Sequence, residues 1–340
     1  MGLRGECEDL IMGARSGLVV LIVLVGLVAA VGPPLTAATV PAAPAEFVAV
    51  PEGGGNLPLW NMGLYSSSTG TLIRRLATFS GSSFTNNGLA LAPDGAAVYF
   101  TLIPNHAGRR FYLRLMRLDV ATRRQTLIAK GAQPAISEDG TQLAYAAFPH
   151  GLKVRDLATG SSRTIGLAQL GAASDLLNAT IGWLGDGSDI AIIPSPTPWD
   201  LVGRPPKLHW CGTTQSHAVI VLVHVPAPPA PLTADCVHLA GPAMAGSIAV
   251  AGSPASPTTL LLAADSYPGP TRVEQIAETG AVSQVLTIPN SLPLAFDPSG
   301  THLLYLVGHS PPVLWEATIA NGHLTDRQRL PKRNWGSIAW

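Results

Sequence analysis

A short phrase that recurs along the chain constrains its fold more than any other feature. Each copy is an apolar segment, a tight turn and a second alternating segment. The turns are built on the pairs Asp94-Gly95, Asp139-Gly140, Asp186-Gly187 and Ser299-Gly300. Asp can hydrogen-bond to the backbone of its own turn, and Gly readily adopts the positive φ that such a turn requires. The phrase therefore predicts repeated β-hairpins.

The spacing of these turns predicts a β-propeller. Asp94, Asp139 and Asp186 are 45 and 47 residues apart, and a second phrase such as Leu152–Gly160 supplies two further strands after a hairpin. Four-stranded units repeated at a period of about 45 residues are typical of propeller blades. The 113 residues between Asp186 and Ser299 leave room for a degenerate unit and for an insertion over 194–215. We therefore expect six blades of four antiparallel strands.

The two ends of the repeat region predict how the ring closes. The chain ends at Gly336–Trp340, which has the pattern of the first strand of a blade, and the folded part begins at Glu46–Val50, which has the pattern of a second strand. Pairing these two segments would hide both open edges. We therefore predict an all-β, six-bladed propeller over 46–340, closed by the C-terminal strand, which completes the N-terminal blade.

The two repeated phrases resemble the bacterial TolB-type propeller repeat, a relative of the WD40 repeat. The resemblance covers most of the chain from about residue 46 and implies an envelope interaction module. A TolB protein proper also carries an N-terminal α/β domain, whereas here only the linker 33–45 precedes the first strand. The function of TolB proteins is therefore a weak guide to the function of this chain.

The N-terminus predicts export from the cytoplasm. No charged residue occurs from Ser16 to Ala45, and 17–32 is almost purely apolar. We expect one apolar helix there, either a transmembrane anchor or the core of a cleaved signal peptide. Residues 1–16 would be a short cytoplasmic N-terminus and 33–45 an Ala/Pro linker. Either alternative places the propeller outside the cytoplasm, anchored through this membrane segment or secreted.

The net charge and the cysteine positions restrict the class of partner and the cellular compartment that we expect. The formal net charge is zero and there is no long Lys/Arg block, so nucleic acid is not expected as a partner. Cys211 and Cys236 flank one predicted hairpin in what would be an oxidising compartment. We expect a disulfide between them, with two buried free thiols as the alternative.

Sequence motifs for catalysis are absent. The chain has no G-x-S-x-G, no P-loop, no H-E-x-x-H and no C-x-x-C, so no catalytic residue, cofactor or metal is predicted. The aspartates and glycines of the repeated turns are interpreted as structural.

One candidate binding face remains. Three histidines fall in loops between the second and third strands of different blades, and the insertion adds aromatic and polar residues to the same face. The set is His106, His150, His309, Trp199, Asp200, His209 and Trp210. Such residues would suit a non-catalytic propeller that binds a protein, peptide or glycan partner at the cell envelope. The alternative is a metal-dependent extracytoplasmic hydrolase or lyase that uses this His-bearing loop face.

Overall fold

The protein is described from a computed structural model. The described residues are 46–51, 59–80, 88–102, 113–147, 150–171, 176, 179–184, 187–194, 211, 219–238, 248–253, 256–265, 270–277, 279, 281–297, 299–308, 313–320, 322–331 and 335–340. They form strands and turns within one compact unit, Val40–Trp340. The segments 1–16, 17–32 and 33–45, with the helix expected there, lie outside them. Among the described residues, no helix has the length and apolar character needed to cross a membrane.

Four sheets have four antiparallel strands each. The closing sheet has the order β23 (Trp335–Ala339), β1 (Glu46–Pro51), β2 (Leu59–Ser66) and β3 (Leu72–Ser80). The next contains β11 (Ala179–Trp183), β12 (Asp189–Pro194), β13 (Val219–His224) and β14 (Thr233–His238). The third contains β15 (Ile248–Ser253), β16 (Ser256–Asp265), β17 (Thr271–Ile276) and β18 (Val282–Ile288). The last contains β19 (Ser291–Phe296), β20 (His302–Val307), β21 (Val313–Ala320) and β22 (His323–Arg329).

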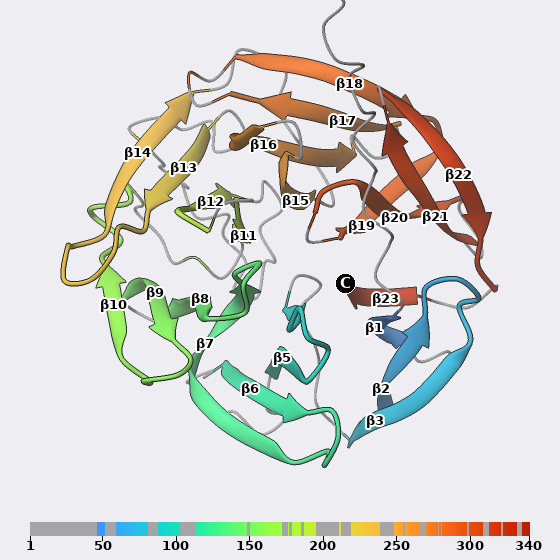
Figure 1. Cartoon of the computed structure of the whole chain (residues 1–340), viewed down its shortest axis with the longest axis horizontal. Coiled ribbons are helices and arrows are strands. Elements are labelled where there is room, and N and C mark those ends of the chain that lie inside the picture. The colour runs from blue at the N-terminus through green and yellow to red at the C-terminus, as the bar shows by residue number, and fades with distance from the viewer. Residues whose placement is uncertain are drawn as a thin grey trace, which may run out of the picture. The chain divides into compact units, whose positions relative to one another are not determined.

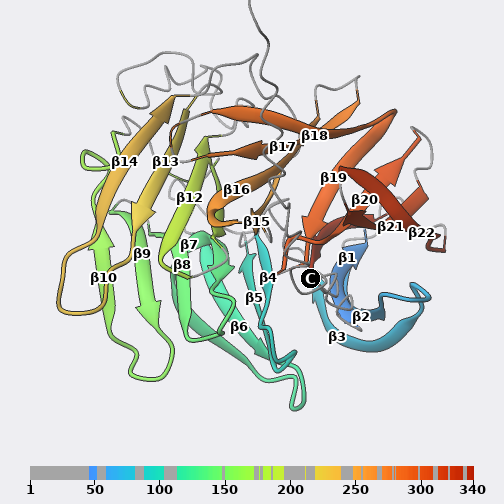
Figure 2. The same ribbon diagram turned by 45° about the horizontal axis from the view of Figure 1, so that its top comes forward.

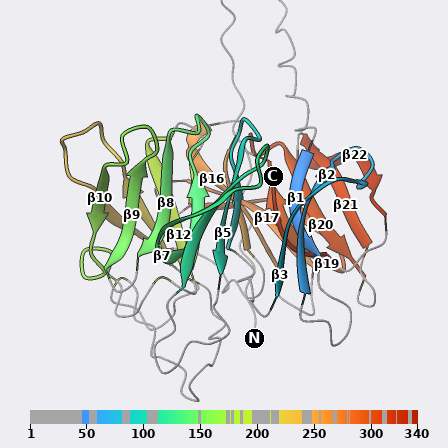
Figure 3. The same cartoon turned by 90° about the horizontal axis from the view of Figure 1, so that it is seen from below.

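The remaining strands form one seven-stranded sheet. Its strands are β4 (Leu89–Leu91), β5 (Ala97–Leu102), β6 (Arg114–Asp119), β7 (Gln125–Ile136), β8 (Gln142–Ala147), β9 (Gly151–Asp156) and β10 (Ser162–Ile165). Strands β23, β4, β7, β11, β15 and β19 lie next to one another, in this order, around a common centre (Figures 1 and 2). Seen from the side, the strands run between two faces of the ring (Figure 3).

The prediction of six four-stranded blades is wrong. The all-β propeller has four four-stranded blades and the seven-stranded sheet, because β7 continues without a break through 12 residues. Its first half pairs with β6, with Lys130 opposite Arg114, and its second half pairs with β8, with Gly131 opposite Ala147. A Cβ at Gly131 would lie 2.5 Å from the carbonyl oxygen of Ala146, so glycine permits the close passage at the change of partner.

The pairing of the two chain ends is confirmed. Strand β23 pairs antiparallel with β1, with Ala339 opposite Val48 and Ile338 opposite Ala49. The side chains at this seam pack against the β19–β22 sheet in a core that includes Phe47, Leu304 and Trp335. The Phe47 and Trp335 ring centroids are 5.7 Å apart. Closure therefore combines backbone hydrogen bonds with the burial of aromatic area.

The repeated turns have the geometry that their residues favour. Asp94 Oδ1 accepts a hydrogen bond from the Ala96 N–H at 2.9 Å, and Asp139 Oδ1 accepts one from the Thr141 N–H at 3.0 Å. The turn glycines have positive φ at Gly95, Gly140, Gly187 and Gly300, with values from 68° to 71°. Asp186 lies outside the described residues. The same local chemistry thus connects the first two strands of successive units.

A disulfide joins Cys211 to Cys236 on β14. The Cα atoms are 5.9 Å apart and the cysteines are 25 positions apart in the sequence. The Cys211 N–H donates a 2.9 Å hydrogen bond to the carbonyl of Gly171, which follows β10. The disulfide thereby links β14 to Cys211, whose backbone is hydrogen-bonded to the segment that follows β10 of the seven-stranded sheet.

We predict that Ile338→Ala lowers the free energy of unfolding by about 3 kcal/mol, because Ile338 is buried at the seam and its truncation leaves a cavity. Urea unfolding followed by circular dichroism measures this. The matched control is Leu127→Ala on an outer part of β7, where the side chain is 59% exposed and the change is expected to stay within about 0.5 kcal/mol. Equal effects of the two substitutions would contradict a closing role for β23.

Replacing both cysteines, Cys211→Ser with Cys236→Ser, is expected to lower the free energy of unfolding by about 3 kcal/mol, since the cross-link restricts the unfolded chain. Reductant is expected to destabilise the native protein to a similar extent and to leave the double variant unchanged. A native protein whose unfolding midpoint does not respond to reductant would contradict the prediction.

Candidate acid–base site

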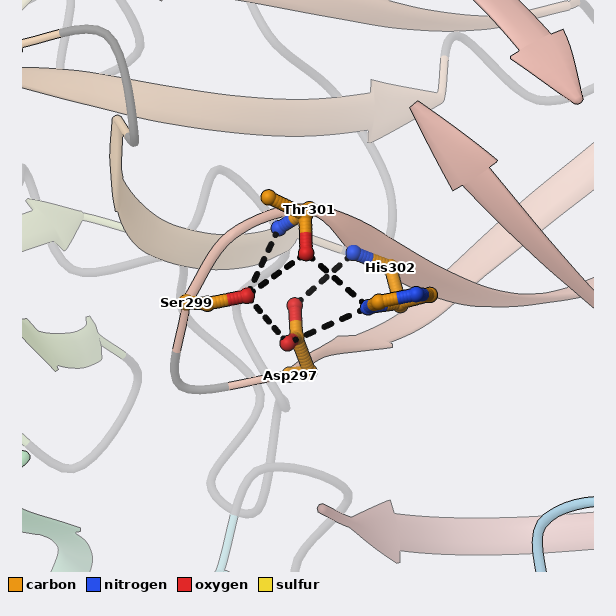
Figure 4. A network of polar contacts seen from close by, with 4 residues as sticks. All are labelled: Asp297, Ser299, Thr301 and His302. Atoms are coloured by element: carbon orange, nitrogen blue, oxygen red, sulfur yellow. Dashed lines mark hydrogen bonds and ion pairs between the residues drawn. The ribbon is translucent and has the colours of Figure 1, made fainter. Parts of the chain in front are cut away.

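The turn between β19 and β20 contains a buried carboxylate bound to an imidazole (Figure 4). Asp297 and His302 are 2% and 5% exposed. The His302 N–H donates to Asp297 Oδ1 at 2.8 Å, and His302 Nδ1 lies 3.3 Å from Asp297 Oδ2. The carboxylate therefore contacts both the backbone and the ring of the same histidine.

Two hydroxyl groups complete this network. Ser299 Oγ donates to Asp297 Oδ2 and lies 2.6 Å from Thr301 Oγ1, which in turn is 2.9 Å from His302 Nδ1 (Figure 4). Both hydroxyls belong to the turn, so the sequence from Asp297 to His302 supplies all four polar groups. The orientation of the carboxylate and of the ring is fixed by short, local hydrogen bonds.

Glu316 on β21 lies beside this network. His302 is opposite Thr318 and Leu304 is opposite Glu316, so His302 and Glu316 are on the same face of the sheet, as diagonal neighbours. Glu316 is 9% exposed, and its Oε2 atom has no hydrogen-bond partner among the residues that the structure describes. Burial raises the pKa of Glu316; the neighbouring His302 opposes the rise and the charge of Asp297 adds to it.

This face of the sheet is turned toward the closing sheet. Leu304 and Leu314 on it pack with Phe47 and Trp335. The His302 ring centroid is 6.0 Å from that of Trp340, the residue that follows β23. The histidine and the glutamate are therefore positioned where the two ends of the propeller meet.

A fourth titratable group comes from the seven-stranded sheet. Glu138 is an exposed residue in the turn after β7. Its pKa is raised by partial burial, then by the charge of Asp297 and by that of Asp139. The charge of Asp297 therefore acts on Glu138, although 159 positions separate them in sequence. We call Glu138, Asp297, His302 and Glu316 the acid–base cluster.

Comparison of the repeated units shows that His302 and Glu316 are not required by the turn. Two residues after the turn glycine, where the last unit has His302, the other units have Ala97, Gln142 and Asp189. The residue two positions later on the same strand has a partner on the next strand of the sheet. That partner is Glu316 in the last unit and Arg117, Val154 and Leu222 in the other units. These turns were interpreted from the sequence as structural only; comparison of the units could have singled out His302 and Glu316, but not their relation to Glu138.

Of the residues of the predicted binding face, His150 alone falls within the described ranges. His150 is exposed, and its N–H donates to the Ala147 carbonyl at 2.6 Å in the turn before β9. His106, Trp199, Asp200, His209, Trp210 and His309 lie outside the described residues. Within the described ranges, no group of three or more His, Cys, Asp or Glu residues is placed to hold a metal ion.

A second histidine lies between two carboxylates on the β11–β14 sheet. His224 Nδ1 is 2.7 Å from Asp189 and Nε2 is 3.0 Å from Asp235. Burial lowers the pKa of His224, but the hydrogen bonds to Asp235 and Asp189 and their charges outweigh it, so the net shift is upward. Both ring nitrogens are occupied and Asp235 is largely exposed, so this group forms a surface ion pair rather than a reactive site.

Comparisons with known proteins show a fold class and no family. No family model and no curated protein matches the chain. A Bacteroides uniformis protein named as a 6-phosphogluconolactonase is 15% identical with a TM-score of 0.47, over 86% of this chain and 83% of that one. A Vibrio parahaemolyticus oligogalacturonate lyase is 14% identical with a TM-score of 0.46, over 85% and 80%. Dipeptidyl peptidase 4 of Porphyromonas gingivalis is 11% identical with a TM-score of 0.38, over 85% of this chain and 47% of that one.

These neighbours are propeller-like, as this chain is, and they do not show that it is TolB-like. They are named as enzymes. The main expectation from the sequence, a non-catalytic propeller that binds a partner, finds no counterpart among these neighbours, and the likeness to them is one of fold alone. The acid–base cluster is the feature of this chain in which an activity can be sought.

The raised pKa of Glu316 gives a testable pH dependence of stability. The folded state binds the proton of the Glu316 carboxyl more tightly than the unfolded state does. The stabilisation that this proton gives is therefore present below the unfolded pKa of 4.5 and is lost as the pH rises through the folded pKa. Glu316→Gln is therefore expected to be more stable relative to the native protein at about pH 8 than at about pH 4. Urea unfolding at both pH values measures this.

Glu274→Gln is the matched control for that measurement. Glu274 is partly buried on β17 and lies 3.7 Å from Arg272, so its charge has a partner. It is not expected to show the same gain at high pH. A Glu316→Gln variant whose relative stability is the same at both pH values would contradict the burial of an unpaired carboxyl at this position.

Proposed function

We propose that the protein is an extracytoplasmic hydrolase or lyase whose acid–base chemistry takes place at the acid–base cluster. One observation carries this proposal: Glu138 and Glu316 come from different sheets, and the charge of Asp297 raises the pKa of each. Asp297 thus acts electrostatically on carboxyl groups of two different sheets. Enzymes place carboxyl groups in unlike environments, so that one keeps its proton and acts as donor while another is ionised and acts as base.

The geometry supports separate roles for the members. Glu138 is exposed, and its raised pKa favours retention of a proton, so it would donate that proton to a leaving group. Asp297 is held by Ser299 and by His302 and would accept a proton from water in a hydrolase or from a substrate carbon in a lyase. Ser299, Thr301 and His302 would act as positioning residues for Asp297.

The location and the finer family belong to the same proposal. The disulfide between Cys211 and Cys236 is consistent with an oxidising compartment, and the apolar segment 17–32 supports membrane anchoring or secretion. Membership of the TolB-like group rests on the repeated phrases alone. The metal dependence suggested for the loop face with His106, His150 and His309 is addressed by metal analysis of the purified protein.

We predict that the purified full-length protein turns over at least one member of a panel of esters, lactones, glycosides, uronides and aminoacyl amides. Glu138→Gln is expected to lower kcat by about 10²–10⁴-fold, since the amide keeps the shape and cannot donate a proton in the same way. The pH–rate profile is expected to lose its high-pH limb in this variant, because that limb reports loss of the Glu138 proton.

Glu274→Gln serves again as the control and is expected to retain native turnover. If Glu138→Gln and Asp297→Asn both retain native kcat on the substrate that the panel identifies, the chemistry is elsewhere and the proposal fails. Activity that depends on added metal and is lost on His150→Ala would assign the chemistry to the loop face.

A further inference from the structure

One end of the propeller carries exposed apolar side chains. The described chain enters the ring at Glu46, which is paired with Ser66 at the end of β2, so the start of β1 and the β2–β3 turn lie at the same end of their strands. We call this the entry end. Strand β3 begins there with Leu72 and Ile73, which are 41% and 50% exposed. In the described part of the chain three large hydrophobic residues are exposed, and two of them form this aliphatic pair.

A second apolar element lies at the same end, on the opposite side of the ring. The connection between β13 and β14, residues 225–232, contains only valine, proline, alanine and leucine. We call it the proline loop; its exposed residues are Pro226, Ala227, Pro228, Pro229 and Pro231. Figure 3 shows the loop, in yellow, projecting from the same face as the β2–β3 turn.

The proline loop is held in place by an arginine of the neighbouring sheet. Arg163 Nη1 donates hydrogen bonds to the carbonyls of Pro226, at 2.6 Å, and Ala230, at 3.1 Å. Val225 and Leu232 are buried at the two ends of the loop. The loop is therefore a fixed apolar projection.

Exposed arginines adjoin the aliphatic pair. Arg74 and Arg75 follow it directly, and Arg74 Nη1 donates a 3.1 Å hydrogen bond to the carbonyl of Val120. This bond joins β3 to the β6–β7 turn, which carries Arg123 and Arg124. Within the described ranges, none of these four arginines forms an ion pair. Their charges are therefore open to an anionic partner.

Few carboxylates lie on the same elements. Asp119 is 3.7 Å from Arg117 and also accepts a 2.8 Å hydrogen bond from the Thr122 N–H. Glu46 and Asp94 are the other carboxylates that the structure describes from β1 to β6. The arginines therefore outnumber the acids on this part of the rim.

This combination favours a phospholipid surface as the partner. Arginines form charge-assisted hydrogen bonds to lipid phosphates, and apolar side chains beside them enter the boundary between headgroups and acyl chains. A soluble polyanion would use the arginines and would leave the apolar groups in water.

The position of the tether supports the same partner. The apolar segment 17–32 is joined to Glu46 by the linker 33–45. Its 13 residues span at most about 45 Å when fully extended. A membrane segment at 17–32 would thus connect to the propeller at the end that carries the arginines and the apolar groups.

We infer that the entry end of the propeller lies on a phospholipid membrane. The aliphatic pair and the proline loop contact the apolar boundary, and Arg75, Arg123 and Arg124 bind lipid phosphates. The inference rests on the membrane location within the proposed function and does not depend on the acid–base cluster. The turn of Glu138 is at the same end, so a substrate of the proposed enzyme would approach it from the membrane side.

Single dye labels on the full-length protein test this contact. Ile73→Cys, at the entry end, and His150→Cys, at the opposite end of the strands, are each labelled with nitrobenzoxadiazole in a Cys7→Ser background. The proteins are reconstituted in vesicles of phosphatidylcholine and phosphatidylglycerol. Doxyl-labelled lipid is expected to quench the dye at position 73 at least about twofold more than the dye at position 150, because only the first reaches the bilayer.

Further variants separate the apolar and charged contributions. A dye on Ala227→Cys, in the proline loop, is expected to be quenched as strongly as the dye at position 73. Replacing Arg123 and Arg124 by Gln is expected to reduce the quenching at position 73 about twofold, and added salt is expected to act in the same direction. Replacing both by Lys keeps the charge and is expected to retain most of the quenching. All these positions are exposed, and circular dichroism verifies that each variant is folded.

The outcomes distinguish this inference from the proposed function. If the protein floats with the vesicles but the dyes at positions 73 and 150 are quenched equally, the membrane location stands and the inference is overturned. If the protein does not float, both are overturned. If the two dyes are quenched equally and heparin binds the native protein but not the Gln variant, the arginines bind a soluble polyanion and the inference is overturned. Turnover is measured without vesicles, so the acid–base proposal stands or fails separately.

Discussion

The antiparallel pairing of β23 with β1 is the interaction on which the rest of the propeller depends. It joins residues almost three hundred positions apart, with Ile338 opposite Ala49, and gives the inner edge of β1 a partner. Without it, the closing sheet would present unpaired backbone groups at the centre of the ring. The seam core around Phe47 and Trp335 forms only when both ends are in place, so its hydrophobic stabilisation is conditional on the pairing.

The candidate site shares this dependence. His302 and Glu316 lie on the sheet face that packs against the closing sheet, and the His302 ring is near Trp340. The low polarity of the seam is what raises the pKa of Glu316. The electrostatic character of the cluster is therefore a property of the closed ring, and no single sheet would produce it.

Much of the fold could be predicted from the sequence because its determinants are local. The Asp-Gly turns at Asp94 and Asp139 specify hairpins within a few residues, and the unmatched strand patterns at the two ends specify the closure. The continuous β7 could not be predicted, since whether a strand breaks between Lys130 and Gly131 depends on its partners on both sides. The cluster could not be predicted as a unit, because the charge of Asp297 acts on Glu138 only when the ring is folded.

The unbroken course of β7 has a mechanical consequence for the protein. Elsewhere a connection separates each sheet from the next, so one sheet can loosen while its neighbour stays paired. Across the seven-stranded sheet the same backbone segment belongs to both hydrogen-bonded ladders, so disorder that starts in β5 or β6 is transmitted directly to β8. These seven strands would open as one cooperative unit, and the turn that carries Glu138 is located at the end of the strand that they share.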